Sequence, residues 1–125
     1  MVEAGQQEEK MYDWDVMEIG HTCPPMTVEI TKESIANYAR SVQNSNPIYY
    51  EDEAAKAAGF DGVIGAPTMC YAFAPMRRNV IMNHHGYVSP EQATKDTRST
   101  PFAGSNIVFQ GLPVRPGDVI TSTST

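Results

Sequence analysis

The sequence has little cysteine, little positive charge and no long apolar run, and each shortage excludes a class of protein. Two cysteines, Cys23 and Cys70, are too few for a disulfide framework, so a reducing, cytoplasmic setting is expected. Nine Lys and Arg residues against fifteen Asp and Glu residues give a net charge of −6, whereas nucleic-acid binding needs a clustered basic surface. No apolar run approaches the ~20 residues that cross a membrane as a helix. We therefore expect no nucleic-acid partner and no membrane partner.

The rest of the composition is that of one soluble domain. The chain has 125 residues, of which 41% are hydrophobic and 19% are charged, enough for one core but small enough to favour a partner. Residues 1–10 are polar and acidic, unlike a secretory signal, and are expected to form a disordered tail. The domain is then expected to span residues 11–125.

Apolar periodicity predicts an α+β domain. A strand is expected where Met26, Val28 and Ile30 alternate with polar residues. Thr31 suits the N-cap of a following helix, whose apolar face recurs at the helical spacing in Ile35, Tyr38, Ala39 and Val42.

Alternation returns near the C-terminus. It predicts two strands, residues 105–112 and 119–125, joined by a Pro-Gly-Asp turn over residues 113–118. Residues 83–101 have no sustained period and indicate a long loop, with one helical turn over residues 90–93.

Turn chemistry is concentrated in residues 41–69. Pro47 restricts its neighbour and removes a donor, so the first helix must end before it. Acidic residues then begin a short Ala-rich helix over residues 52–58, and Gly59 fits the left-handed position that ends such a helix. Asp52 and Lys56 are spaced for an i,i+4 ion pair on this helix.

A second helix is expected to follow Pro67, which suits a first helical position. Residues 69–81 are apolar on nearly all sides, as in a buried helix, and Pro75 should kink or restart it. Trp14 is expected to pack in the core, with a partner-facing anchor as the alternative.

These residues resemble the signature of the MaoC-like hydratases, a branch of the hotdog-fold acyl-CoA enzymes. The resemblance is closest to the N-terminal-type MaoC domain and covers roughly residues 15–125. It is carried by Asn46-Pro47-Ile48-Tyr49, the acidic-then-alanine helix, Gly59-Phe60 and Ala66-Pro67-Thr68-Met69. It implies a hotdog fold, in which an antiparallel sheet wraps a long central helix, here residues 69–81. The family continues through further strands beyond the end of this chain, so a truncated chain or strands from a partner are expected.

The resemblance also implies a reaction. MaoC-like enzymes of fatty acid metabolism hydrate a trans-2-enoyl-CoA or dehydrate a 3-hydroxyacyl-CoA, and an Asp and a His move the protons. The corresponding positions here are Asn44 and Tyr49. An amide exchanges no proton under these conditions and a phenol is a poor base, so both catalytic positions are expected to be inactive.

Other candidate residues are expected to bind the substrate. At the position where the family's backbone amide polarises the thioester carbonyl, Pro67 has no N–H, which leaves Gly65 or Thr68 as the donor. Two arginines are candidates for the coenzyme A phosphates, although solvated surface charge explains either one alone. The substrate-binding candidates are Asn46, Gly65, Thr68, Arg77 and Arg78.

No metal or cofactor is expected besides the coenzyme A of the substrate. Adjacent His84 and His85 rarely face one site, and no spaced Cys, His or Asp set completes a tetrahedral cage. Cys70 is interpreted as a small core residue, because no positioned His base is apparent.

Two classes of function remain open. In the first, the chain is a silent subunit or half of a MaoC-like enoyl-CoA hydratase or 3-hydroxyacyl-CoA dehydratase. It would form a homo- or heterodimer with another hotdog domain, which carries the Asp and His, and would help to shape the acyl-CoA pocket. In the second, the chain is itself an enzyme, a hydratase with unorthodox groups or a hotdog thioesterase that uses Asp61, Glu51 or Asp52. The structural alternative is a non-catalytic hotdog partner, in which Asn44 caps a helix and Tyr49 packs its ring.

Overall fold

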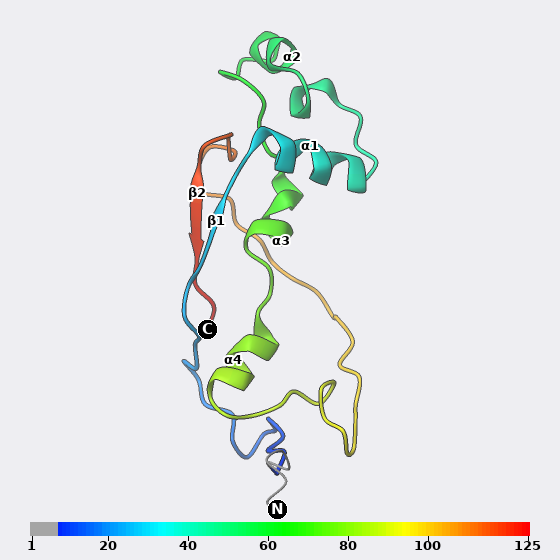
Figure 1. Cartoon of the computed structure of the whole chain (residues 1–125), viewed down its shortest axis with the longest axis vertical. Helices are drawn as coiled ribbons and strands as arrows, with labels where there is room; N and C mark the ends of the chain where they lie inside the picture. The colour runs from blue at the N-terminus through cyan, green and yellow to red at the C-terminus, as the bar shows by residue number, and fades with distance from the viewer. Residues whose placement is uncertain (1–7) are drawn as a thin grey trace, which may run out of the picture. The chain divides into compact units, whose positions relative to one another are not determined.

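The computed structural model of the chain describes residues 8–125 (Figure 1). Its backbone contacts define two compact units. The sheet unit comprises residues 25–76 and 107–122, and the terminal unit comprises residues 8–24, 77–106 and 123–125. The single domain expected over residues 11–125 stays a prediction.

A two-stranded antiparallel sheet anchors the sheet unit. Strands β1 (Met26–Glu29) and β2 (Val119–Ser122) lie side by side in Figure 1 and pair with Val28 opposite Ile120. The side chains of Val28 and Ile120 pack on the core. The Pro-Gly-Asp turn precedes β2 as predicted, with Gly117 at φ +91°. The α+β class and these two strands are therefore confirmed, although both strands are shorter than expected.

Helix α1 (Lys32–Ser41) begins at the predicted cap. The Ser34 N–H donates to Thr31 Oγ1 and the Thr31 N–H donates to Ser34 Oγ, both at 2.9 Å, which completes a capping box. Ile35 and Ala39 are buried on the core side, in agreement with the predicted apolar face. The helix ends where Gln43 adopts φ +57° and the Asn44 N–H donates to the Ala39 carbonyl.

The next turn and helix follow from the Asn-Pro signal. The 3-10 helix η1 (Pro47–Tyr49) leads into α2 (Asp52–Ala57), and Gly59 takes φ +98° just after it. The predicted Asp52–Lys56 pair is wrong. The Asp52 carboxylate turns away from its own helix to Lys32, and Lys56 instead meets Glu53 at 3.4 Å.

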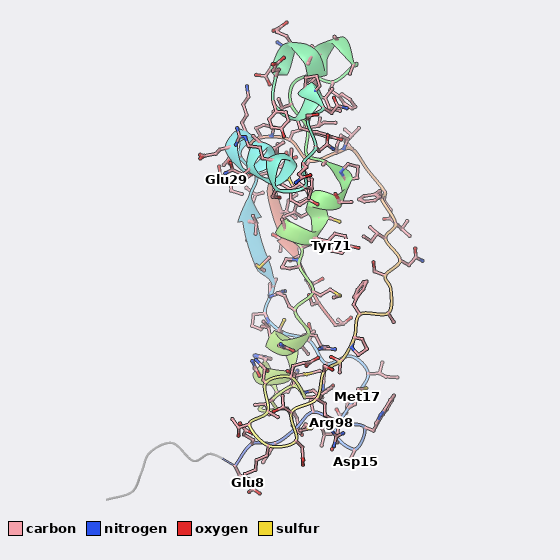
Figure 2. The ribbon with its side chains drawn as sticks, turned by 90° about the vertical axis from the view of Figure 1, so that its right-hand side faces the viewer. Glu8, Asp15, Met17, Glu29, Tyr71 and Arg98 are labelled. Carbon is pink, nitrogen blue, oxygen red and sulfur yellow. The ribbon has the colours of Figure 1, made fainter. Side chains whose placement is uncertain are left out.

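The predicted central helix is broken. The 3-10 helix η2 (Pro67–Met69) continues into α3 (Cys70–Phe73), and α4 (Arg78–His84) is a separate helix. Pro75 accounts for the break, because residue 74 before it leaves the helical region at φ −135°. The expectation of burial on all sides is also wrong, since Tyr71 is 44% exposed (Figure 2) and Met76 is 71% exposed.

The strand predicted over residues 105–112 is not formed. This segment is extended coil in Figure 1, and the turn after it leads to β2, which pairs with β1 instead. Alternating apolar residues suit a strand, but a strand forms only where a neighbour completes its hydrogen bonds. Among the described residues no such neighbour lies beside this segment.

In the terminal unit, the N-terminal segment pairs with the segment that follows α4. Met11 bridges to Val88, and the Val88 N–H donates to the Lys10 carbonyl at 2.8 Å. Most of the predicted tail, residues 1–7, lies outside the described residues. The prediction for Trp14 is wrong, because its side chain is 88% exposed on a turn that also exposes Met17 (Figure 2).

Among residues 8–125 no helix has the length and apolar content that a membrane crossing requires.

Candidate functional site

The sheet unit contains a cavity of about 730 Å³. This volume lies within the ~300–1,000 Å³ typical of small-molecule sites. No charged side chain of the described residues lines the cavity, and most lining side chains are aliphatic or aromatic. The lining residues are Ile48, Tyr49, Phe60, Ile64, Gly65, Ala66, Pro67, Cys70 and Phe73, with residues 107–114.

One wall is formed by residues 64–66, with residues of η1 and α3 beside it. The Gly65 N–H donates to the Val114 carbonyl at 2.8 Å, which brings the two backbones close together. A Cβ at Gly65 would lie 2.4 Å from Val114 Cγ2, so only glycine fits without a shift. This contact joins the two walls of the cavity.

The other wall is the extended segment 107–114. It lines the cavity and yet leaves apolar side chains in solvent, with Val108 70% exposed and Leu112 84% exposed. An exposed apolar segment beside a cavity is a common feature of binding surfaces.

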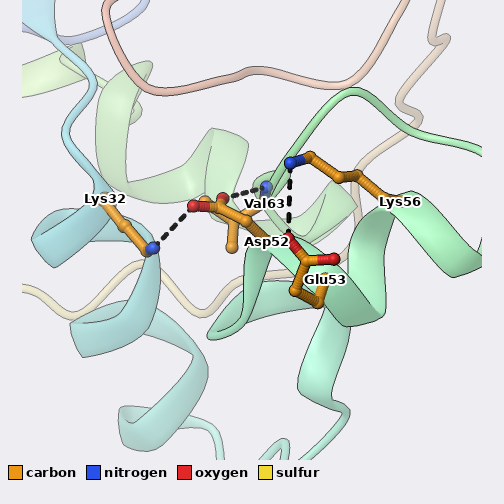
Figure 3. A network of polar contacts seen from close by, with 5 residues as sticks. All are labelled: Lys32, Asp52, Glu53, Lys56 and Val63. Carbon is orange, nitrogen blue, oxygen red and sulfur yellow. Dashed lines mark hydrogen bonds and ion pairs between the residues drawn. The ribbon is translucent and has the colours of Figure 1, made fainter.

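A network of charged side chains contacts the backbone next to the first wall (Figure 3). Asp52 Oδ2 accepts from Lys32 Nζ at 2.9 Å, and Asp52 Oδ1 accepts from the Val63 N–H at 3.0 Å. The hydrogen bond from Lys32, followed by that from the Val63 amide, lowers the pKa of Asp52 below its ordinary value. The carboxylate therefore ties the first turns of α1 and α2 to the residue that precedes the cavity wall.

The two predicted catalytic positions have different surroundings. Asn44 is not a lining residue, and its Oδ1 accepts from the Asn46 N–H at 3.1 Å in a local turn. Tyr49 lines the cavity, but it is 9% exposed and packs in the hydrophobic core. Neither arrangement provides a proton-transfer pair.

The predicted pocket residues of the sheet unit have different surroundings. Asn46 caps η1, with its Oδ1 accepting from the Ile48 N–H at 3.2 Å. Thr68 Oγ1 accepts from the Tyr38 hydroxyl at 2.8 Å, and Thr68 is not a lining residue. Gly65 lines the cavity, but Val114 already accepts its N–H, which is therefore not available to an oxyanion.

Both predicted arginines belong to the terminal unit. Arg77 Nη1 donates to the Pro24 carbonyl at 2.9 Å. Arg78 Nη2 donates to Glu91 and to Thr100 Oγ1. The Glu91 carboxylate has a lowered pKa, first because of a hydrogen bond from its own backbone and then because of Arg78.

The carboxylates considered for thioester hydrolysis lie outside the cavity lining. Asp61 is almost fully exposed and lies 3.7 Å from Arg115, and Asp52 is committed to the network of Figure 3. Cys70 is partly exposed and lines the cavity, rather than being a buried core residue.

The adjacent histidines take part in ring contacts in the terminal unit. His85 stacks on His21 with ring centroids 4.1 Å apart, and His85 Nε2 lies 2.9 Å from the Thr22 carbonyl. Within residues 8–125 no group of three or more His, Cys, Asp or Glu side chains is placed to hold a metal ion.

Sequence reasoning did not identify most of the cavity lining. Phe60, Phe73 and segment 107–114 line the cavity, whereas residues 105–112 were predicted as a strand and residues 113–118 as a turn. The alternation of apolar residues in this segment did not distinguish a strand from an extended cavity wall.

Taken together, these features define a small α+β protein with an apolar cavity, which no charged side chain of residues 8–125 lines and which is suited to hold an apolar group. The chain belongs to the family described as "FAS1-like, dehydratase domain region", whose model matches residues 17–125.

Several relatives are named UPF0336 proteins. That of Streptomyces avermitilis is 32% identical over 108 residues, which cover 86% of this chain and 67% of the relative. That of Streptomyces griseus is 30% identical with the same coverage, and that of Saccharopolyspora erythraea is 32% identical over 65 residues, 51% of this chain and 42% of the relative.

Proposed function

We propose that the chain is a subunit or half of a MaoC-like enoyl-CoA hydratase or 3-hydroxyacyl-CoA dehydratase with a hotdog fold, and that its cavity holds the acyl chain. The observation that carries this proposal is the apolar cavity in a chain of a dehydratase-domain family. Burial of each methylene there would contribute about 0.8 kcal/mol.

The proton-transfer groups come from a partner under this proposal. Asn44 is held in a turn and Tyr49 in the core, so this chain supplies neither the acid nor the base. A second hotdog domain, in a homo- or heterodimer in the cytoplasm, carries the Asp and His, and the CoA thioester is the substrate with no further cofactor.

Acyl binding is tested by calorimetric titration with saturated acyl-CoA of increasing length. Affinity is expected to rise about fourfold per methylene until the cavity is filled. Val108→Asp, which adds a charge to the lining at an exposed position, should weaken binding at least tenfold. Val119→Asp is the matched control, because Val119 is an exposed valine of the same unit that does not line the cavity.

Catalysis is tested with a short trans-2-enoyl-CoA by the loss of absorbance of its conjugated thioester. The chain alone should give no turnover, and a complex with a hotdog protein that carries Asp and His should give turnover. Turnover by the chain alone that Tyr49→Phe abolishes would overturn the silent-half assignment. If the chain binds no acyl-CoA, the non-catalytic structural alternative replaces the proposal.

A further inference from the structure

We propose that Asp52 is a positioning residue whose carboxylate, through the Val63 N–H, sets the place of the cavity wall, residues 64–66, and thereby the affinity of the cavity for an acyl chain. The acyl ligand in this inference rests on the proposed function, whereas the placement of the wall does not.

The Asp52 carboxylate makes its contacts outside its own helix. Asp52 is the first residue of α2, where an acid ordinarily stabilises the free amides of its own helix. Here each oxygen leaves the helix instead, one to Lys32 Nζ at 2.9 Å and the other to the Val63 N–H at 3.0 Å (Figure 3). The carboxylate thus joins three places in the sequence.

The backbone at Gly62 lies close to the Asp52 carboxylate. A Cβ at Gly62 would lie 3.1 Å from Asp52 Oδ1, so the backbone before Val63 comes unusually near the carboxylate. Val63 itself is buried in the core, which leaves its N–H without water as an alternative partner. The hydrogen bond from the Val63 N–H to Asp52 is therefore a specific contact of the folded chain, rather than a chance contact of surface groups.

The Val63 contact is connected to the cavity through the residues that follow Val63. Ile64, Gly65 and Ala66 follow Val63 directly and line the cavity. Three successive amides hold this wall: Val63 to Asp52, Ile64 to the Ile48 carbonyl at 3.5 Å, and Gly65 to the Val114 carbonyl at 2.8 Å. The bond from Val63 has an ionised acceptor, and such bonds are roughly twice as strong as neutral ones.

Asp52 does not line the cavity, so it acts on a ligand only through this wall. Its two contacts can be separated by substitution. Asp52→Asn keeps an oxygen acceptor for the Val63 N–H and loses the charge, Lys32→Gln removes the cation alone, and Asp52→Ala removes both contacts. Glu53→Gln is the matched control, because Glu53 is the adjacent acid, is almost fully exposed and pairs with Lys56 at 3.4 Å.

The experiment measures amide hydrogen exchange at Val63, Ile64 and Gly65, together with affinity for decanoyl-CoA and for decanol, at a temperature where circular dichroism shows every variant folded. Asp52→Ala should speed exchange at these amides and weaken both ligands about tenfold. Asp52→Asn and Lys32→Gln should fall between Asp52→Ala and wild type, and Glu53→Gln should match wild type.

Each result decides the inference. Unchanged exchange in Asp52→Ala overturns it, and so does faster exchange with unchanged affinity, which would leave Asp52 a purely structural residue. If wild type binds decanol but not decanoyl-CoA, the proposed function fails and the decanol affinities of the variants still decide the role of Asp52. If wild type binds neither ligand, both proposals are wrong.

Discussion

Gly65 is the residue at which the two walls of the cavity meet. Its N–H bonds the Val114 carbonyl, and a Cβ there would lie 2.4 Å from Val114 Cγ2 and 3.3 Å from Met69 Sδ. The sequence indicated a functional role for this glycine as an amide donor. The structure shows a packing role instead, because its N–H already has an acceptor within the chain.

Gly65→Ala is expected to lower the free energy of unfolding by about 1–3 kcal/mol, since the new methyl group overpacks a closed contact. Urea unfolding followed by circular dichroism measures the change. Gly111→Ala serves as the control, because Gly111 also lines the cavity but has open space where its Cβ would be. Equal stability of the two variants would contradict this account of Gly65.

Two carboxylates give the protein a dependence on acid pH. The hydrogen bond from Lys32 lowers the pKa of Asp52, and a bond from its own backbone lowers that of Glu91. A carboxyl with a lowered pKa in the folded state stabilises that state above its unfolded pKa of about 4, and this contribution is lost as pH falls through the folded pKa. Thermal midpoints measured from pH 6 down to pH 2.5 should therefore fall mainly below pH 4. Asp52→Asn and Glu91→Gln should each make this fall shallower, whereas Glu53→Gln should leave it unchanged.

At the scale of elements, the local signals were reliable and the long-range ones were not. Helices begin or end as predicted at four residues, Thr31, Pro47, Gly59 and Pro75. The local sequence determines these positions, because capping, ring sterics and left-handed backbone act within a few residues. The predicted strand over residues 105–112 is wrong because pairing depends on a distant neighbour that the local sequence does not encode.

The cavity likewise has one wall that local signals predict and one that depends on long-range contacts. Its first wall follows from the turn chemistry around Pro67, which the sequence shows. Its second wall is segment 107–114, whose place depends on the Gly65–Val114 contact between residues about fifty positions apart. The ion pair of Asp52 with Lys32 has the same cause, since the sequence offered Lys56 as a local partner.

The capping box of α1 carries a prediction at this scale. Thr31→Ala removes the acceptor for the Ser34 N–H and should destabilise the sheet unit by about 0.5–2 kcal/mol. Thr31→Ser keeps the hydroxyl and should restore most of the stability, as measured by urea unfolding. A Thr31→Ser variant as unstable as Thr31→Ala would show that the methyl group, and not the cap, is responsible.

At the scale of the whole molecule, the family and the cavity are the two observations behind the proposed function. The chain belongs to a dehydratase-domain family, and its relatives of UPF0336 type align over most of its length. Its cavity provides apolar surface, while Asn44 and Tyr49, the positions at which the resemblance to MaoC-like hydratases implies Asp and His, make a local turn and pack in the core. A division of labour between an acyl-holding chain and a proton-transferring chain is consistent with both observations.

The proposed division between two chains predicts what happens when Asp and His are introduced at positions 44 and 49. Asn44→Asp keeps an oxygen acceptor for the Asn46 N–H and should fold normally. Tyr49→His replaces a ring packed in the core and should lower stability. The double variant should still give no turnover of a short enoyl-CoA, because residue 44 lies outside the cavity lining and its side chain is held in the turn. Turnover above that of each single variant, measured by the absorbance of the conjugated thioester, would show instead that the backbone of this chain already places both groups for catalysis and that only their chemistry has been lost.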